Sequence, residues 1–354
     1  MLAKMQTFLC WLPFRSPKAK ASTSPAASRS CPTLAPTSSH YTSQDTIVNI
    51  EKSANVKDQL QDAKMENGKV EEIRGKILET YAKLVELKGD YRPGETINKL
   101  LGNLVPVCAE IHDQETVKQV VENAEIQAIL PGLRQICSAS ESCLESYWAD
   151  RIIQGEPGDE AVTRLKKEFL YFGNYEQLAW LEYCGILAAR RTPPKKVAFI
   201  GSGPLPLTSL CLLQELKKDY SPSTITILNI DISQAAIDVS KKLCDSLGEW
   251  AHGMEFACDK AGSSDLDLQD FDVVYVAALV GISQDDKESI VVDVANTMRP
   301  GALLVVRSTL GLRTCLYPEV DMAKEKLLEK LEPCLTLHPH DQVVNSFIVT
   351  KVKE

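Results

Sequence analysis

The stretch Lys196-Val-Ala-Phe-Ile-Gly-Ser-Gly-Pro-Leu-Pro-Leu-Thr-Ser209 decides how the chain is expected to fold. The apolar run from Val197 to Ile200 predicts a short buried strand. Gly201 and Gly203 follow it, and glycine permits positive φ angles and the close approach of a ligand. A helix is expected to start near Pro206, and the amide groups at a helix start favour an anionic or polar ligand. The stretch therefore predicts a strand, a turn and a helix, with or without a ligand at the turn.

The region after this stretch alternates between apolar strands and amphipathic helices. Ser283 and Asp286 have the spacing of a capping box at one helix start. Such alternation is typical of a mainly parallel, doubly wound sheet that helices cover on both faces, here over residues 195–354. The predicted strands are 196–200, 224–230, 253–257, 271–277, 302–308 and 344–351, and the predicted helices are 206–218, 233–247, 283–298 and 319–332.

The preceding region, residues 66–190, predicts an all-helical domain. An apolar stripe at helical spacing runs from Val70 to Leu87. Further helices are predicted at 94–103, 115–128, 131–153 and from about 159 to 190, with an interruption near Asn174. The two prolines in Arg191-Thr-Pro-Pro-Lys195 end the last helix and mark the boundary between the domains.

Residues 1–64 lie outside these patterns. The first 44 residues contain no Asp or Glu, five Lys or Arg, and many Ser, Thr, Pro and Ala. This composition cannot support a packed core and also resembles an organelle transit peptide. We expect a disordered tail in a cytoplasmic protein, or alternatively a transit peptide that directs the protein to a plastid or mitochondrion.

Charge and composition exclude several classes of partner. The net charge of the 354-residue chain is −9, which argues against nucleic acid because phosphate binding needs clustered Lys and Arg. No apolar run reaches the roughly 18 residues that span a bilayer. The 11 cysteines include no Cys-x-x-Cys, and the five histidines show no metal-ligand spacing, so no metal is expected. Reduced thiols suggest an intracellular compartment, and the oligomeric state stays open.

The ends of the predicted strands carry the residues expected to bind a nucleoside. Asp231 ends the second strand, where a carboxylate can accept hydrogen bonds from ribose hydroxyls, although it could instead cap the next helix. Asp259 follows the third strand, within reach of an adenine amine, although it could be an ordinary loop carboxylate. Ala277 ends the fourth strand. The predicted binding set is Gly201, Ser202, Gly203, Pro204, Asp231, Asp259, Ala277 and Arg307.

The glycine turn itself distinguishes between ligand types. Pro206 stands where the dinucleotide fingerprint has its third glycine, which argues against a bound pyrophosphate. The whole set resembles a class I methyltransferase-type fold that binds S-adenosylmethionine. Phe199, however, stands where such proteins usually carry an Asp or Glu for the methionine amino group. The amino-acid arm of the ligand is therefore expected to be held differently.

Longer stretches resemble one family, the nicotianamine synthases. The resemblance covers about residues 66–352 and is most specific in Gly201-Ser-Gly-Pro-Leu-Pro206. It implies that three S-adenosylmethionine molecules yield nicotianamine and three 5′-methylthioadenosine by aminocarboxypropyl transfer, with no cofactor beyond the substrate. The other similar stretches are 136–145, Leu170-Tyr-Phe-Gly-Asn-Tyr175, Leu181-Glu-Tyr183, Asp272-Val-Val-Tyr-Val-Ala-Ala-Leu-Val-Gly281, Leu304-Val-Val-Arg-Ser308, Leu316-Tyr-Pro-Glu-Val-Asp321 and 338–346.

The resemblance also implies a Glu and a Tyr of the helical domain as catalytic residues. We match them to Glu145 and Tyr171, with Glu141 and Tyr175 as alternatives. The two glutamates are four residues apart, so a solvated helix face would look the same.

Four further side chains near the expected site carry charge or can titrate. Arg307 ends the fifth strand and is a candidate for holding a substrate carboxylate bidentately. Arg313 could do the same or be a surface charge. His338 and His340 are expected to have a structural or lid role.

Two other functions compete with this interpretation. One is an ordinary small-molecule methyltransferase, which would release S-adenosylhomocysteine instead of methylthioadenosine. The other is a non-catalytic protein that binds an adenosyl ligand without turnover.

Overall fold

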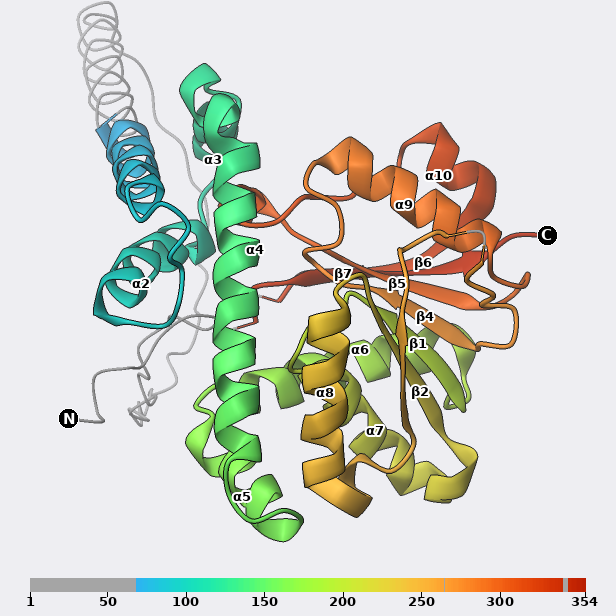
Figure 1. The fold of residues 1–354 in the computed structure, drawn as a ribbon. Helices are drawn as coiled ribbons and strands as arrows, with labels where there is room; N and C mark the ends of the chain where they lie inside the picture. The colour runs from blue at the N-terminus through green and yellow to red at the C-terminus, as the bar shows by residue number, and fades with distance from the viewer. Residues whose placement is uncertain (1–67, 264, 340–342) are drawn as a thin grey trace, which may run out of the picture. The chain divides into compact units, whose positions relative to one another are not determined.

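The structure is a computed structural model that describes residues 68–263, 265–339 and 343–354 (Figure 1). The predicted tail, residues 1–64, and His340 lie outside the described residues. All elements named below belong to one compact unit, which spans residues 73–354 in the described part. A second unit, Leu12–Glu72, contributes only the helical residues 68–72 to that part.

The core of the described chain is a seven-stranded sheet with the order β3-β2-β1-β4-β5-β7-β6. Strands β1 to β5 are parallel, and β7 runs antiparallel to both β5 and β6. The strand order reverses between β1 and β4, which is where ligands bind in open α/β sheets. The strands are β1 (Lys196–Ile200), β2 (Thr226–Asp231), β3 (Met254–Cys258), β4 (Val273–Val276), β5 (Leu303–Ser308), β6 (Leu331–Leu337) and β7 (Ser346–Val352).

Helices cover both faces of the sheet, as Figure 1 shows. Successive side chains of a strand point to opposite faces. Phe199 and Tyr275 therefore pack with α6 (Phe172–Arg190) and α7 (Leu207–Asp219). Ile200 and Val276 pack on the other face with α9 (Gln284–Asn296) and the short α10 (Glu325–Lys330). Helix α8 (Gln234–Leu247) joins β2 to β3 and contacts both strands.

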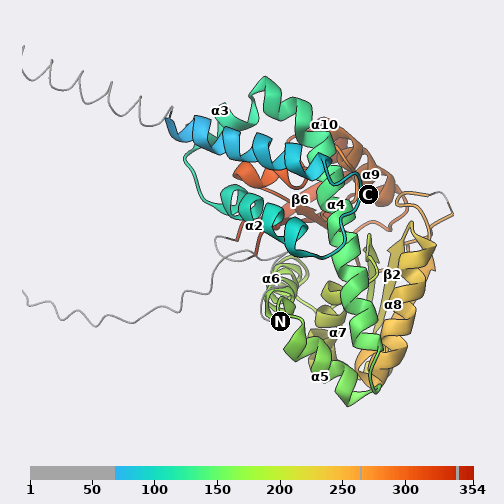
Figure 2. The same ribbon diagram turned by 60° about the vertical axis from the view of Figure 1, so that its left-hand side comes forward.

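The helices before the sheet pack against it and its connections. Residues 73–85 are helical, followed by α2 (Glu95–Ala109), α3 (Gln114–Val121), α4 (Ala124–Ile153) and α5 (Asp159–Glu168). Helix α4 is the long helix in both views (Figures 1 and 2). It contacts α8 and the 3-10 helix η3 (Gly311–Cys315), where Arg134 donates two hydrogen bonds to the Thr314 carbonyl, at 3.1 and 2.7 Å.

The helix boundaries differ from prediction in two places. The predicted helices 115–128 and 131–153 are divided at Asn123 instead, and α4 continues through Pro131. Asn123 begins α4 by accepting hydrogen bonds from Glu125 N and Ile126 N, so the polar cap outweighs the proline as a boundary signal. The last predicted helix breaks at residues 169–171 and runs uninterrupted through Asn174.

Strand β6 was not predicted. The helix expected at 319–332 is only the six-residue α10, and the chain then enters β6. Pro333 disfavours a strand from the sequence, but β6 lies at the sheet edge, where proline is tolerated, and its pairing with β7 is irregular near this residue. The predicted cap of α9 is confirmed, because Ser283 Oγ accepts from Asp286 N at 3.1 Å.

Candidate active site

The glycine turn after β1 begins the site. Gly201 N and Ser202 N donate to the Ile230 carbonyl at 2.8 and 3.1 Å, which ties the turn to the end of β2. Gly201 and Gly203 have φ angles of +80° and +66°. A Cβ on Gly203 would lie 2.4 Å from Glu145 Oε2, and one on Gly201 would lie 2.5 Å from a methyl of Val280. The glycines are thus required by neighbouring protein side chains as well as by backbone conformation.

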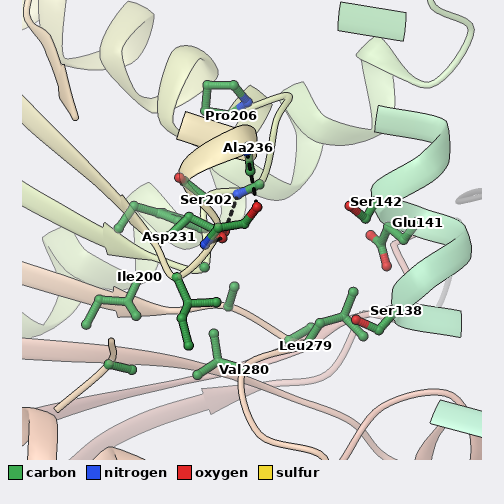
Figure 3. A pocket seen from close by; sticks show the side chains of 18 of the residues that line it. Ser138, Glu141, Ser142, Ile200, Ser202, Pro206, Asp231, Ala236, Leu279 and Val280 are labelled. Carbon is green, nitrogen blue, oxygen red and sulfur yellow. Dashed lines mark hydrogen bonds between the residues drawn. The ribbon is translucent and has the colours of Figure 1, made fainter. Parts of the chain in front are cut away.

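A cavity of about 510 Å³ opens at the carboxyl ends of β1, β2 and β4 and is closed on the other side by α4. Figure 3 shows Asp231 and Ser202 on one side of it and Ser138, Glu141 and Ser142 reaching in from α4. The structure brings most of the predicted site residues to this cavity: Glu141, Glu145, Tyr175, Gly201, Ser202, Gly203, Pro204, Asp231, Asp259, Ala277 and Arg307.

Asp231 links the glycine turn to the start of α8. One of its oxygens accepts from Gly203 N and the other from Ser233 N, each at 2.9 Å. The side chain that caps α8 is Ser233, whose hydroxyl accepts from Ala236 N. Each Asp231 oxygen retains acceptor capacity toward the cavity. Asp259 also faces the cavity, and its backbone N–H donates to the Asp231 carbonyl at 3.1 Å.

Two buried hydroxyls in the cavity wall have no hydrogen-bond partner among the described residues. They are Ser202 Oγ and Ser209 Oγ, and both atoms are inaccessible to solvent. Buried polar groups are nearly always hydrogen-bonded, so a partner for these oxygens requires their hydroxyl groups to rotate toward the cavity. Ile232 and Ile282 are exposed at the rim and supply apolar surface. This combination of apolar rim, carboxylates and hydroxyls fits a nucleoside.

Helix α4 places two half-buried carboxyl groups in the cavity. Glu141 and Glu145 are one helical turn apart, so both point to the same side. Burial raises the pKa of Glu141 to about 7, although Arg307 and a hydrogen bond from Tyr317 oppose the rise. Burial raises the pKa of Glu145 further, together with the charges of Glu141 and Asp231. The alternative that these glutamates form a solvated helix face is therefore wrong.

The structure separates the two candidate tyrosines. Tyr175 lines the cavity. Tyr171 is buried before α6, where its ring meets that of Phe169 edge-on at 5.5 Å, and it is not part of the cavity wall. Of the two, only Tyr175 is placed to contact a ligand in the described cavity.

The two candidate arginines also differ in their surroundings. Arg307 lines the cavity, but its Nε and Nη2 donate to the buried Glu182 at 2.8 and 3.1 Å. Arg313 is buried away from the cavity and donates to the carbonyls of Pro339 and Ala109, so it is not a surface charge. His338 Nδ1 and Ser346 Oγ are 2.8 Å apart, in keeping with a structural role.

Three residues near the cavity had no predicted role. Glu182 and Tyr317 lie within stretches that resemble the nicotianamine synthases, and this was the available signal. Lys287 of α9 gave no such signal in the sequence. Its fully buried ammonium donates to the carbonyls of Ala277 and Ala278 at 2.8 and 2.7 Å and so fastens the cavity wall after β4. Burial lowers the pKa of Lys287 to about 7.

The strand order and the cavity at the switch point define a Rossmann-like protein of the class I methyltransferase type. The model of the family "Nicotianamine synthase protein" matches residues 65–354. The chain therefore belongs to the nicotianamine synthase family.

Curated relatives agree with this assignment, and a solved structure shares the fold. The chain is 33% identical over 276 residues to nicotianamine synthase of Solanum lycopersicum, covering 78% of this chain and 82% of the relative. It is 34% identical over 262 residues to nicotianamine synthase 9 of Hordeum vulgare, covering 73% of each. A glutamate-to-glutamine variant of MtNAS in complex with S-adenosylmethionine has the same fold, with a TM-score of 0.64 at 20% identity, over 79% of this chain and 98% of that one.

No helix in the described part of the chain has the length and apolar character that crossing a bilayer would need.

Proposed function

We propose that the protein condenses three S-adenosylmethionine molecules into nicotianamine and releases three 5′-methylthioadenosine. The family assignment supports this proposal, as does the pair of half-buried glutamates that α4 places in the cavity, with Glu145 against the glycine turn. An adenosine bound at the turn would put its sulfonium near these carboxyl groups. S-adenosylmethionine acts as substrate, and no step requires another cofactor.

The proposed chemistry is a nucleophilic substitution at carbon. The amine lone pair of one substrate attacks Cγ of the methionyl arm of another, a new C–N bond forms, and the Cγ–S bond breaks. The electron pair of that bond passes to sulfur, which leaves as neutral methylthioadenosine. The new ammonium group then loses one proton. The same step within one aminocarboxypropyl arm, in which the amine attacks Cγ of its own arm, closes the four-membered azetidine ring of nicotianamine.

The protein's part is to position the reactants and accept protons. A carboxylate on α4 can hold an attacking ammonium by charge-assisted hydrogen bonds and take its proton before attack. Glu141, with its pKa raised to about 7, suits this exchange near neutral pH. Tyr175, which also lines the cavity, can donate a hydrogen bond to the same group. Alignment of nitrogen and carbon in the enclosed cavity supplies a large part of the rate enhancement.

The test is product analysis of the purified full chain with S-adenosylmethionine alone. We expect methylthioadenosine and nicotianamine in a three-to-one ratio, identified by mass. Release of S-adenosylhomocysteine would replace this proposal with the methyltransferase alternative. Tight S-adenosylmethionine binding without any product would favour the non-catalytic alternative.

A further inference from the structure

Arg307 joins three elements of the fold. It stands on β5, its Nε and Nη2 donate to both oxygens of Glu182 on α6, and Nη2 also donates to Thr208 Oγ1 on α7 at 2.8 Å. Glu182 has no exposed surface, and Arg307 is 6% exposed. A bidentate pair of this kind fixes the plane of the guanidinium as well as its position.

The ring of Phe199 also contacts Arg307. The Arg307 guanidinium carbon lies 5.4 Å from the centre of the Phe199 ring, which stacks on Tyr275 at 5.2 Å. An aromatic face attracts a cation. Phe199 stands where methyltransferases usually have the acid that binds the methionine amino group. This corner of the cavity therefore offers a cation where an anion is usual.

One nitrogen of Arg307 remains for a ligand. Nε has a single proton, given to Glu182, and both protons of Nη2 are engaged by Glu182 and Thr208. Within the described part of the chain, Nη1 has no hydrogen-bond partner, yet it is not among the buried atoms that lack one. Because Arg307 lines the cavity, Nη1 is the end that reaches it. A carboxylate can be held by Nη1 alone, and not by the bidentate contact expected from the sequence.

We propose that Glu182 is a positioning residue that turns Nη1 of Arg307 toward the α-carboxylate of the ligand's aminocarboxypropyl arm. The identity of the ligand rests on the proposed function. The charge of Glu182 offsets that of Arg307, so the buried pair stays neutral until a carboxylate binds. Fixing the Arg307 guanidinium matters for the reaction, because an arm held at its carboxylate presents Cγ in a fixed direction.

Two unreactive probes test this assignment in the full-length protein. S-adenosylhomocysteine carries the arm but has a neutral thioether, and methylthioadenosine lacks the arm. The substitution Glu182→Asp keeps the charge and draws the guanidinium back by one methylene. The substitution Arg307→Lys keeps the charge and removes the planar guanidinium group. We expect either change to weaken S-adenosylhomocysteine binding about tenfold or more, the scale of a charged hydrogen bond, and to leave methylthioadenosine binding within about twofold.

The matched control is Tyr183→Phe, which removes a hydrogen bond from the neighbouring residue of α6 to Asp219 and should spare both affinities. Equal losses for the two probes in Glu182→Asp, or no loss, would overturn the proposal. If the variants fail to fold, the wild-type protein decides. It should bind the decarboxylated analogue of S-adenosylhomocysteine about tenfold more weakly, and equal affinities would again overturn the proposal. Binding needs no turnover, so these results stand apart from the product analysis.

Discussion

At the scale of single residues, the cavity brings two half-buried carboxyl groups close to one another. Two such groups titrate as a pair, because a first charge disfavours a second. Burial raises both pKa values, and that of Glu145 the further. Glu145 is therefore the more protonated member of the pair near neutral pH.

Burial raises the pKa of Glu141, and the charge of Arg307 and a hydrogen bond from Tyr317 both lower it. Removing a hydrogen bond to the charged form raises a carboxyl pKa. Activity that needs the Glu141 carboxylate should rise through pH 7 in the wild type, and Tyr317→Phe should shift this limb to higher pH. The measurement is the pH profile of kcat. An unshifted limb with reduced kcat would show that Tyr317 is only structural.

Glu145→Gln separates the roles of the two glutamates. The substitution keeps the shape and removes the proton exchange, so S-adenosylmethionine should still bind while most turnover is lost. Calorimetry and product quantification measure the two effects, and Glu141→Gln is the matched variant. If Glu145→Gln keeps its product formation while Glu141→Gln loses it, Glu141 alone exchanges the proton.

Asp231→Ala tests the nucleoside end of the cavity. Asp231 fastens Gly203 N and Ser233 N, and its remaining acceptor capacity is expected to bind the ribose. Affinity for S-adenosylmethionine should fall by about 1.5–3 kcal/mol, the range for charged hydrogen bonds. An affinity within error of the wild type would reduce Asp231 to a turn-stabilising residue.

At the scale of elements, the sequence predicted the parallel strands because each is an apolar run bounded by turn residues. It therefore also predicted Asp231, since a strand end can be read locally. It could not reveal Glu182 as the partner of Arg307, because 125 positions separate them and only packing of α6 on β5 joins them. The position of Tyr171 was equally beyond local pattern, because this residue lies in the break before α6 and not on the helix that carries Tyr175.

The contact between α4 and the glycine turn can be tested with Gly203→Ala. The new Cβ would meet Glu145 Oε2 at 2.4 Å and would also be strained at φ +66°. Gly301→Ala is the control, because Gly301 has φ +81° but nothing within 4 Å of the added atom. Both variants should lose stability from backbone strain, by about 1–2 kcal/mol. Only Gly203→Ala should also lose turnover, and similar kcat losses in both would contradict a role for the Glu145 contact.

At the scale of the whole molecule, the helices before the sheet belong to the same compact unit as the sheet itself. Helix α4 supplies one wall of the cavity, and η3, which follows β5, packs against α2 and α3. The domain boundary expected at residues 191–195 therefore marks a change of secondary structure within this unit. We infer that the helical region cannot be removed without opening the cavity.

Removal of the tail, residues 1–64, is expected to leave the cavity intact, unlike removal of the helical region. The cavity residues lie between Ser138 and Asn345, and the family match begins at residue 65. A protein that starts at Met65 should therefore keep its kcat/KM within about twofold and its Tm, because no side chain of the cavity wall is lost. Deletion through Asn123 serves as the contrasting variant, since it also removes α2 and α3 from η3 and should lower both quantities. Loss of activity on removal of residues 1–64 alone would show that the tail takes part in folding or catalysis and is more than a targeting or spacer segment.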